Sequence, residues 1–600
     1  MSSDELFFGL DLSTQQLKII TTDLNLKIHS TYTVEFDKDL PHYKTNKGVY
    51  SNEITGEIYT NVSIWIEALD LILSKMKLNN FPFDKIKGIS GSCQQHGSVY
   101  WSKDANNLLS SLSIDKSLKD QLIPNAFTLQ TSPNWQDHST GEEILKFETY
   151  LNGAEHLAQI TGSRAHYRFT GPQIRKIVKN NNEIYHKTFR ISLVSSFLQS
   201  LLCGQITNIE EADACGMNLF DINKRNWNDE LLSIATLTHD KDLLSSSSID
   251  SKDLKLKAIN ELKSKLGEEI IPIDNNPKSL GSISKYFVEK YKFSSNCKIY
   301  SFTGDNLATI LSIPLQKDEI LISLGTSTTV LLITENYIPS SNYHLFIHPT
   351  IPNTYMGMIC YCNGSLAREK IRDLINLKFQ TKGWTKFDEI LDKFPSFNNK
   401  LGIYFPIGEI VPNSKPQTLR GKLNPKTQDL EIVDSWDIEL DVSSIVESQA
   451  LSCRIRSSPM LSIRSNSSSS SSSSSSPILE EDLKFDGKYI PYIQLQQRPN
   501  KVFYVGGGSQ NQSIVSKFGQ ILGSLSGDFK IDNSNACAIG GAFKATWSWV
   551  IDERGNKKGF HEFLTEKFDW NALNRLDIDS KWNDYTSGIV LLNKLENELK

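Results

Sequence analysis

The chain has 600 residues, of which 39% are hydrophobic and 22% are charged, with a formal net charge of −5 and a pI near 6.2. This length is too great for a single hydrophobic core and predicts at least two domains. The composition is typical of a soluble globular protein, and the charge balance excludes a general attraction to nucleic acid or to an anionic membrane.

Neither a targeting segment nor a disulfide framework is evident in the sequence. The first residues lack the basic region and apolar core of a secretory signal, and no apolar run approaches the length of a membrane span, so we expect a cytoplasmic protein that does not bind membranes. The 8 cysteines are scattered, without paired Cys-x-x-Cys motifs or histidines at ligand spacing, and are predicted to be reduced core residues.

The first predicted supersecondary unit is a β-hairpin with a polar tip. Apolar residues 7–12 and 17–21 predict two strands, and the turn between them carries Thr14 and Gln15. Backbone N–H groups and hydroxyls at such a tip suit an oxyanion, and Asp11 suits a hydrated metal cation beside it. A plain surface turn between core strands is the alternative for a single copy of this pattern.

A helix and a further strand are predicted after this hairpin. Residues 62–77 repeat apolar side chains at helical spacing, which is typical of a helix packed on a core. The strand predicted at residues 86–90 ends in a polar, glycine-flanked segment, 91–98, which contains His96 and suits the recognition of hydroxyl groups. An ordinary surface or core histidine is the alternative for His96.

An aspartate follows the strand predicted at residues 297–302. In phosphoryl transfer, a carboxylate such as that of Asp305 orients or deprotonates the attacking hydroxyl. The alternative is that Asp305 caps a helix that begins at Leu307.

A second hairpin repeats the pattern of the first. Strands are predicted at residues 320–324 and 330–333, and the tip between them holds Gly325, Thr326 and Ser327. The recurrence predicts two related domains, whose tips would face each other across a cleft and hold a polyphosphate. The alternation of strands and helices predicts mixed or parallel sheets covered by helices.

Two segments of biased composition lie in the last third of the chain. The ten serines at 467–476 predict a disordered surface insertion within the second domain, because they cannot bury enough apolar surface to become ordered. A strand predicted at 502–505 runs into three glycines at 506–508, where the backbone can approach a ligand before the helices predicted at 514–522 and 536–550. A simple glycine-rich turn is the alternative.

Taken in chain order, these motifs resemble those of the FGGY carbohydrate kinases over nearly the whole chain. Within the family they are most similar to the xylulose kinases of eukaryotes, above all of fungi, in the segments 11–16, 91–97, 161–171 and 323–328. The resemblance implies an α/β fold of two actin-like (ribonuclease H-like) domains with an interdomain active-site cleft. The implied domains are residues 1–312 and 313–600, with the disordered insertion at about 462–478 in the second.

The resemblance also implies roles for individual residues. Asp305 is the expected general base, which takes the proton of the sugar's terminal hydroxyl as this attacks the γ-phosphate of ATP, and Asp11 is expected beside Mg²⁺. The expected sugar contacts are His96, Arg168, Asp305 and Asn306. The expected ATP contacts are Thr14, Gln15, Lys18, Gly325, Thr326, Ser327, Gly506, Gly507, Gly508, Asn511 and Trp384. For Trp384, a place in the core is the alternative to packing near the adenine.

The implied activity is the ATP-dependent phosphorylation of D-xylulose to D-xylulose 5-phosphate, which feeds the pentose phosphate pathway. The implied cofactors are ATP and Mg²⁺, and the expected assembly is a monomer or a homodimer without nucleic acid. Two alternatives stay open: an FGGY kinase for another ketose or polyol, and a non-catalytic actin-like sensor of sugar or nucleotide. Asp305 argues against the sensor, because a sensor needs no base at that position.

Overall fold

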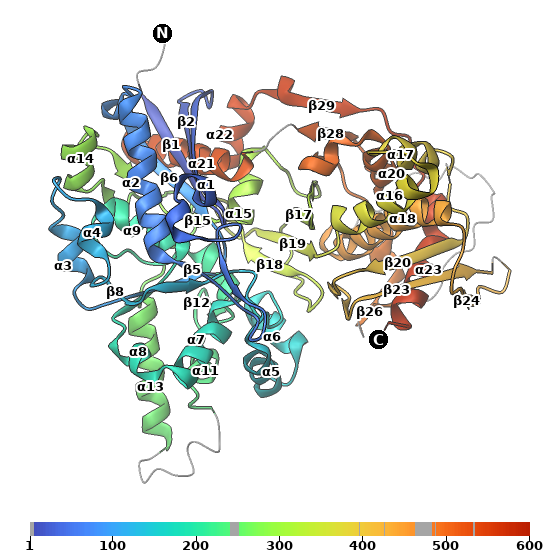
Figure 1. Ribbon diagram of the computed structural model, residues 1–600, viewed down its shortest axis with the longest axis horizontal. Helices are drawn as coiled ribbons and strands as arrows, with labels where there is room; N and C mark the ends of the chain where they lie inside the picture. Colours follow the sequence, from blue (N-terminus) through green and yellow to red (C-terminus); the bar gives the residue numbers. More distant parts are fainter. Residues whose placement is uncertain are drawn as a thin grey trace.

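Two seven-stranded sheets, one from each half of the chain, form the framework of the fold (Figure 1). The computed structural model describes residues 5–239, 251–394, 396–424, 426–462, 483–485, 488–531 and 535–599. The serine-rich insertion predicted at about 462–478 lies outside these ranges, except for Ser462.

The first sheet has the strand order β13-β14-β6-β1-β2-β3, with β15 also paired to β6. Strand β1 pairs antiparallel with β2, which confirms the first predicted hairpin, and parallel with β6 on its other side. The strands are β1 (Leu6–Leu12), β2 (Gln16–Asp23), β3 (Ile28–Glu35), β6 (Ile86–Cys93), β13 (Gly281–Ser282), β14 (Lys298–Ile299) and β15 (Thr303–Gly304).

The second sheet repeats this arrangement, with the order β18-β19-β17-β16-β27-β28-β29. Strand β16 pairs antiparallel with β17 and parallel with β27, so it occupies the place that β1 has in the first sheet. The second predicted hairpin is therefore confirmed, and the two hairpins lie at equivalent positions in the two sheets. The strands are β16 (Ile320–Leu324), β17 (Thr328–Thr334), β18 (His344–Ile347), β19 (Tyr355–Tyr361), β27 (Val502–Val505), β28 (Asp528–Ile531) and β29 (Leu573–Leu576).

Helices pack on these sheets where the apolar spacing predicts them. In α2 (Val62–Leu78) the side chain of Asn61 caps the first turn, and Trp65, Leu69 and Ile72 are at most 1% exposed. The helices predicted at 514–522 and 536–550 are α20 (Gln512–Leu522) and α21 (Ala536–Arg554). Other long helices are α5 (Gly141–Tyr150), α7 (Thr170–Asn180), α9 (Val194–Cys203), α13 (Ser251–Leu266), α16 (Ser365–Phe379), α18 (Ile438–Ser457) and α23 (Thr586–Asn597).

Helix α21 comes from the second half of the chain but packs on the first sheet (Figure 1). A Cβ atom on Gly9 of β1 would lie 1.9 Å from the carbonyl oxygen of Ala538, and one on Gly540 would lie 1.9 Å from that of Ala308. Only glycine allows backbones to approach so closely. Helix α21 lies after residue 312 in the sequence but packs on the sheet formed by residues 6–304. The division into domains 1–312 and 313–600 therefore stays a prediction.

The described residues bear on two further expectations. None of their helices combines the length and the apolar character that crossing a membrane requires. All 8 cysteines are free thiols, and Cys93, Cys215, Cys297 and Cys453 are buried, as predicted for core residues.

The contact between β1 and α21 predicts that Gly9→Ala destabilises the protein. The added methyl group would press on the Ala538 carbonyl, and such overpacking costs about 1–3 kcal/mol of unfolding free energy. We expect a lower midpoint of thermal unfolding. Gly141→Ala is the matched control, because Gly141 lies in α5 and its new Cβ would meet only Tyr167 at an ordinary 3.6 Å. Equal midpoints for the two variants would contradict the prediction.

Candidate active site

The first hairpin places a buried carboxylate behind a polar tip. Asp11 of β1 lies opposite Ser92 of β6, and its Oδ1 accepts a hydrogen bond from Ser92 Oγ at 3.0 Å. Burial raises the pKa of Asp11 to about 6, while the hydrogen bond from Ser92 and the charge of Lys18 lower it. At the tip, Thr14 Oγ1 accepts a hydrogen bond from Trp135 Nε1 at 2.8 Å.

Asp305 is the first residue of α15 (Asp305–Thr309), directly after β15. Gly304 occupies the N-cap, so the helix does not begin at Leu307 and the alternative that Asp305 caps it is wrong. Burial and the charge of Asp11 raise the pKa of Asp305 to about 7, although the backbone N–H groups of Asp305 and Asn306 and the charge of Arg168 lower it. A nearby cation would therefore stabilise the ionised carboxylates, and Asp305 can exchange a proton near neutral pH.

Asp305 lines two cavities, and a third lies beside the second hairpin. The first, the central cavity, has a volume of about 250 Å³ and is lined by side chains of both halves of the chain. From the first half these include His96, Arg168, Asp305 and Asn306, and from the second half Ser327, Cys362 and Ile410. The structure thus brings together all four residues that the sequence predicts as sugar contacts.

His96 presents a fixed tautomer to the central cavity. Its Nδ1 lies 2.8 Å from the carbonyl oxygen of Gly216, which can only accept, so Nδ1 carries the proton and Nε2 is an acceptor. The ring stacks on Phe169 with 4.4 Å between centroids. Burial lowers the pKa of His96 well below its usual value, and the charge of Arg168 lowers it further. His96 therefore presents an acceptor, and Arg168 presents donors, to the central cavity.

Gln95 lines the same cavity, although the sequence reasoning gave it no role. Its Oε1 accepts a hydrogen bond from Asn306 Nδ2 at 3.2 Å, and the same Nδ2 donates to Asp305 Oδ1 at 3.1 Å. Gln95 thereby holds Asn306 beside Asp305. Its place in the polar segment 91–98 was the available signal.

The second, or hairpin, cavity lies over the tip of the first hairpin and shares Asp305 with the central cavity. Thr14 and Gln15 line it, as does Trp135, which borders both cavities and was not predicted. Trp135 follows the short strand β9 (Thr131–Pro133) in a segment without a recognisable motif, so the sequence gave no signal for it. Lys18 lies outside the lining, and its Nζ donates to Asn535 Oδ1 at 2.5 Å.

The third, or glycine-loop, cavity lies on the other side of the second hairpin. Gly325 and Thr326 of the hairpin line it together with Trp384, Gly507, Gly508 and Asn511. Gly506 does not line it but makes the turn possible, because its φ of +86° is a left-handed conformation that favours glycine. The loop passes so close to β16 that a Cβ on Gly508 would lie 2.8 Å from the Leu324 carbonyl oxygen.

Asn511 and Trp384 are fixed by neighbours in this cavity. The Asn511 side chain caps α20 by accepting from Ile514 N at 3.0 Å and donates to Asp388 Oδ1 at 2.7 Å. Trp384 is half-buried, with the guanidinium of Arg372 4.7 Å from its ring centroid. Its ring contributes to the cavity wall as well as to the packing of the second half.

Family comparisons agree with this geometry. The profile of the FGGY family of carbohydrate kinases, N-terminal domain, matches residues 125–274, and that of the C-terminal domain matches residues 320–549. The chain is 49% identical to the xylulose kinase of Saccharomyces cerevisiae, over 100% of this chain and 97% of the relative. The chain belongs to the FGGY family of carbohydrate kinases. This FGGY kinase is also 42% identical to the probable D-xylulose kinase A of Aspergillus fumigatus, over 91% of the chain and 89% of that relative.

Solved structures of sugar kinases share the fold. Ligand-bound xylulose kinase from Lactobacillus acidophilus matches this FGGY kinase with a TM-score of 0.68 at 14% identity, over 99% of this chain and 97% of that chain. Plasmodium falciparum glycerol kinase with ADP matches with a TM-score of 0.66 at 14% identity, over 98% and 96% of the two chains. These matches confirm the expected two-domain α/β fold.

The geometry of His96 predicts that it stays neutral and keeps its proton on Nδ1. Burial opposes the charged form, so the imidazole should not titrate between about pH 6 and about pH 8. Long-range ¹H–¹⁵N spectra of the histidine-labelled protein report the tautomer, and His96→Gln identifies the signal. A shift of this signal towards the imidazolium form within that range would refute the prediction.

Proposed function

We propose that the protein transfers the γ-phosphoryl group of ATP to D-xylulose and releases ADP and D-xylulose 5-phosphate. Two relatives with 49% and 42% identity carry the names xylulose kinase and probable D-xylulose kinase A. The observation that carries the proposal is the location of Asp305, which borders both the central cavity and the hairpin cavity. A sugar in the first and a phosphate chain at the second would meet at this carboxylate.

Asp305 is proposed as the general base of the transfer. A primary alcohol is a weak nucleophile, so a carboxylate that takes its proton as the new O–P bond forms contributes typically about 10²- to 10⁴-fold. The O–H bond of the terminal hydroxyl breaks, its proton passes to Asp305, and the bond between the γ-phosphorus and the bridging oxygen breaks as ADP leaves. A pKa of about 7 suits a group that must accept and later release a proton.

The sugar would be recognised by hydrogen-bond donors and acceptors that the fold already orients. His96 Nε2 would accept from one sugar hydroxyl and Arg168 would donate to others, while Asn306, whose Nδ2 already donates to Gln95 and Asp305, would accept through its Oδ1. A bound sugar would bury all three groups, so each of these hydrogen bonds would be costly to leave unmade, which favours a ketose with matching hydroxyls over an epimer.

The nucleotide is proposed to lie between the two hairpins and the glycine loop. Thr14 and Gln15 would contact the phosphates from one side, and Gly325, Thr326 and Ser327 from the other, with Lys18 adding positive charge. Gly507, Gly508 and Asn511 would face the adenosine, Gly506 would shape the turn that presents them, and Trp384 would pack near the adenine.

Asp11 suits Mg²⁺ bound together with the nucleotide. Among the described residues no cluster of three or more histidine, cysteine, aspartate or glutamate side chains is arranged as a metal cage. Mg²⁺ is commonly held by one or two carboxylates with substrate phosphates and water, so the single buried Asp11 fits this mode. When bound, the cation neutralises charge on the phosphates.

One assay distinguishes the proposed xylulose kinase activity from the two alternatives, an FGGY kinase for another sugar and a non-catalytic sensor. ADP release is measured with Mg²⁺, ATP and, separately, D-xylulose, L-xylulose, D-ribulose, glycerol and gluconate. We expect a strong preference for D-xylulose. A preference for another sugar would make the protein a different FGGY kinase, and no sugar-dependent turnover would favour the sensor, which the kinase relatives do not favour.

Asp305→Asn is the variant that tests the base in this assay. Its turnover should fall by about 10²- to 10⁴-fold, while its affinity for ADP stays within a few-fold of the wild type. Asp120→Asn, at an exposed aspartate of α4 (Leu118–Leu122), is the control and should keep full activity. Wild-type turnover by Asp305→Asn would end the assignment of Asp305 as base.

The pKa of Asp305 predicts the pH dependence of the reaction. The base works only when ionised, so kcat/KM for the sugar should fall about tenfold per pH unit below the pKa of Asp305. Burial and the charge of Asp11 put this pKa at about 7, and Mg²⁺ near Asp11 would lower it somewhat. We expect kcat/KM at saturating ATP to rise with pH and to level off at or slightly below about pH 7. A flat profile down to about pH 5 would contradict it.

A further inference from the structure

A buried carboxylate lies behind the wall of the central cavity and does not face it. Glu409, in the short strand β21 (Glu409–Ile410), is 6% exposed. Its Oε1 accepts hydrogen bonds from Cys362 N and Ile410 N, both at 2.8 Å, and its Oε2 accepts from Asn363 N at 3.1 Å and Asn363 Nδ2 at 2.9 Å. Since Cys362 and Ile410 line the central cavity, one side chain fixes two elements of its wall.

The turn that Glu409 holds is also attached to the second hairpin. Gly364 N donates to Thr326 O at 3.1 Å, and Ser365 N donates to Gly325 O at 2.9 Å. A Cβ on Gly364 would lie 2.6 Å from the carbonyl carbon of Ser327, so the two backbones are in close contact. Movement of the segment 362–364 would therefore move the hairpin proposed to bind phosphate.

A second side chain extends this connection to the glycine-loop cavity. Gln449 of α18 donates through Nε2 to Asn363 O at 2.7 Å and Gly364 O at 3.2 Å, and its Oε1 accepts from Arg368 Nη1 at 2.5 Å. Arg368 is fully buried and borders the glycine-loop cavity, and its Nε and Nη2 have no partner within the described ranges. Hydrogen bonds thus run from one cavity wall to the other.

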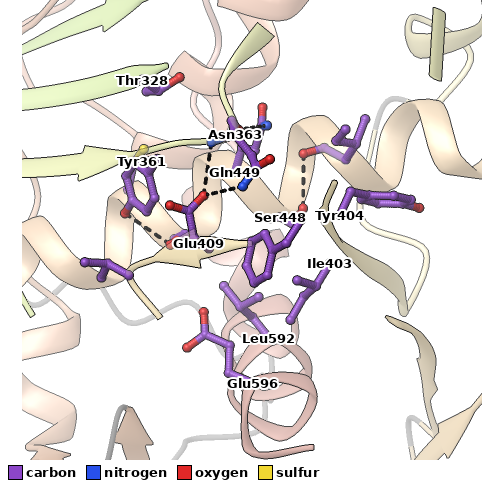
Figure 2. A pocket seen from close by; sticks show the side chains of 15 residues that line it. Thr328, Tyr361, Asn363, Ile403, Tyr404, Glu409, Ser448, Gln449, Leu592 and Glu596 are labelled. Carbon is purple, nitrogen blue, oxygen red and sulfur yellow. Dashed lines mark hydrogen bonds between the residues drawn. The ribbon is translucent and has the colours of Figure 1, made fainter. Parts of the chain in front are cut away.

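The side of this network away from the active site is incompletely packed. Figure 2 shows Glu409 pointing towards Asn363, with Gln449 beside it and Thr328 beyond. All four border a cavity of about 40 Å³. The cavity leaves the segment 362–364 with fewer packing contacts on this side. We therefore infer that its position depends mainly on the hydrogen bonds to Glu409 and Gln449.

We propose that Glu409 and Gln449 are positioning residues that couple the sugar site to the nucleotide site. A sugar that contacts the wall at Cys362 and Ile410 favours one position of the segment 362–364, and this position aligns Gly325 and Thr326 with the nucleotide. Each ligand then strengthens binding of the other by the same factor. The inference rests on the proposed function, because it takes the central cavity as the sugar site.

The test measures the dissociation constant of a non-hydrolysable ATP analogue with Mg²⁺, without and with saturating D-xylulose. In the wild type the sugar should tighten binding about fivefold or more, which is the usual lower range of such coupling. In Glu409→Gln an amide NH₂ faces two N–H donors in place of a carboxylate oxygen. The ratio of the dissociation constants without and with sugar should fall to about 1, while the sugar-free constant changes less than about threefold.

Gln449→Glu is the second variant, for the case that Glu409→Gln does not fold. It keeps an acceptor for Arg368 but turns an oxygen towards the carbonyls of Asn363 and Gly364, and its ratio should also fall to about 1. Glu447→Gln is the matched control. Glu447 is 1% exposed in the same helix, but it accepts a hydrogen bond from Tyr585 OH at 2.8 Å instead of bonding the segment 362–364. It should lower thermal stability and keep the wild-type ratio.

The outcomes separate the inference from the proposed function. A ratio near 1 in the wild type, an unchanged ratio in Glu409→Gln and Gln449→Glu, or a ratio lost equally in Glu447→Gln overturns the coupling. Failure of the proposed function appears instead in the wild type as absent D-xylulose turnover. In that case the ratio is measured with the sugar of the panel that is phosphorylated, and an enzyme that phosphorylates none of them overturns both.

Discussion

The close contact of α21 with β1 and with α15 is the constraint on which the site depends. Gly9 and Gly540 let backbones meet where any Cβ would fall within 2 Å of a carbonyl oxygen. Because β1 carries Asp11 and α15 begins with Asp305, this contact sets the separation of the two carboxylates. A helix from the second half of the chain therefore fixes the geometry of the first.

The protein does not fully stabilise the ionised forms of Asp11 and Asp305. Burial raises the pKa of both, and the charge of Asp11 adds to the effect on Asp305. A structure built only for stability would pair or replace such groups, because a buried charge without a partner is costly. The arrangement becomes favourable when a cation and a proton-donating hydroxyl are supplied, which is what a phosphoryl transfer site provides.

The repeated strand order explains why two hairpins can serve one ligand. β1 and β16 each stand between an antiparallel partner and a parallel one, so the hairpin turns lie at equivalent edges of the two sheets. The second hairpin is further held by Gly364 and Ser365, whose N–H groups bond its carbonyls. Its backbone is thereby fixed by contacts outside its own strands, as a preorganised anion site requires.

The sequence by itself determined the hairpins and the main helices, because strand and helix periods and polar turns are local signals, and it indicated some of the residues that line the cavities. Asp305 and His96 stand in polar segments that follow predicted strands, whereas Arg168 and Asn306 were indicated only by resemblance to a family. Only the tertiary structure decided that α21 packs on the first sheet, that Trp135 borders two cavities, and that Glu409 supports a wall from behind. These three features depend on contacts between residues that are distant in the chain. Neither Trp135 nor Glu409 lies in a sequence motif that would predict such contacts. Local periodicity fixes which face of an element is buried, but the partner that covers it is chosen by the fold as a whole.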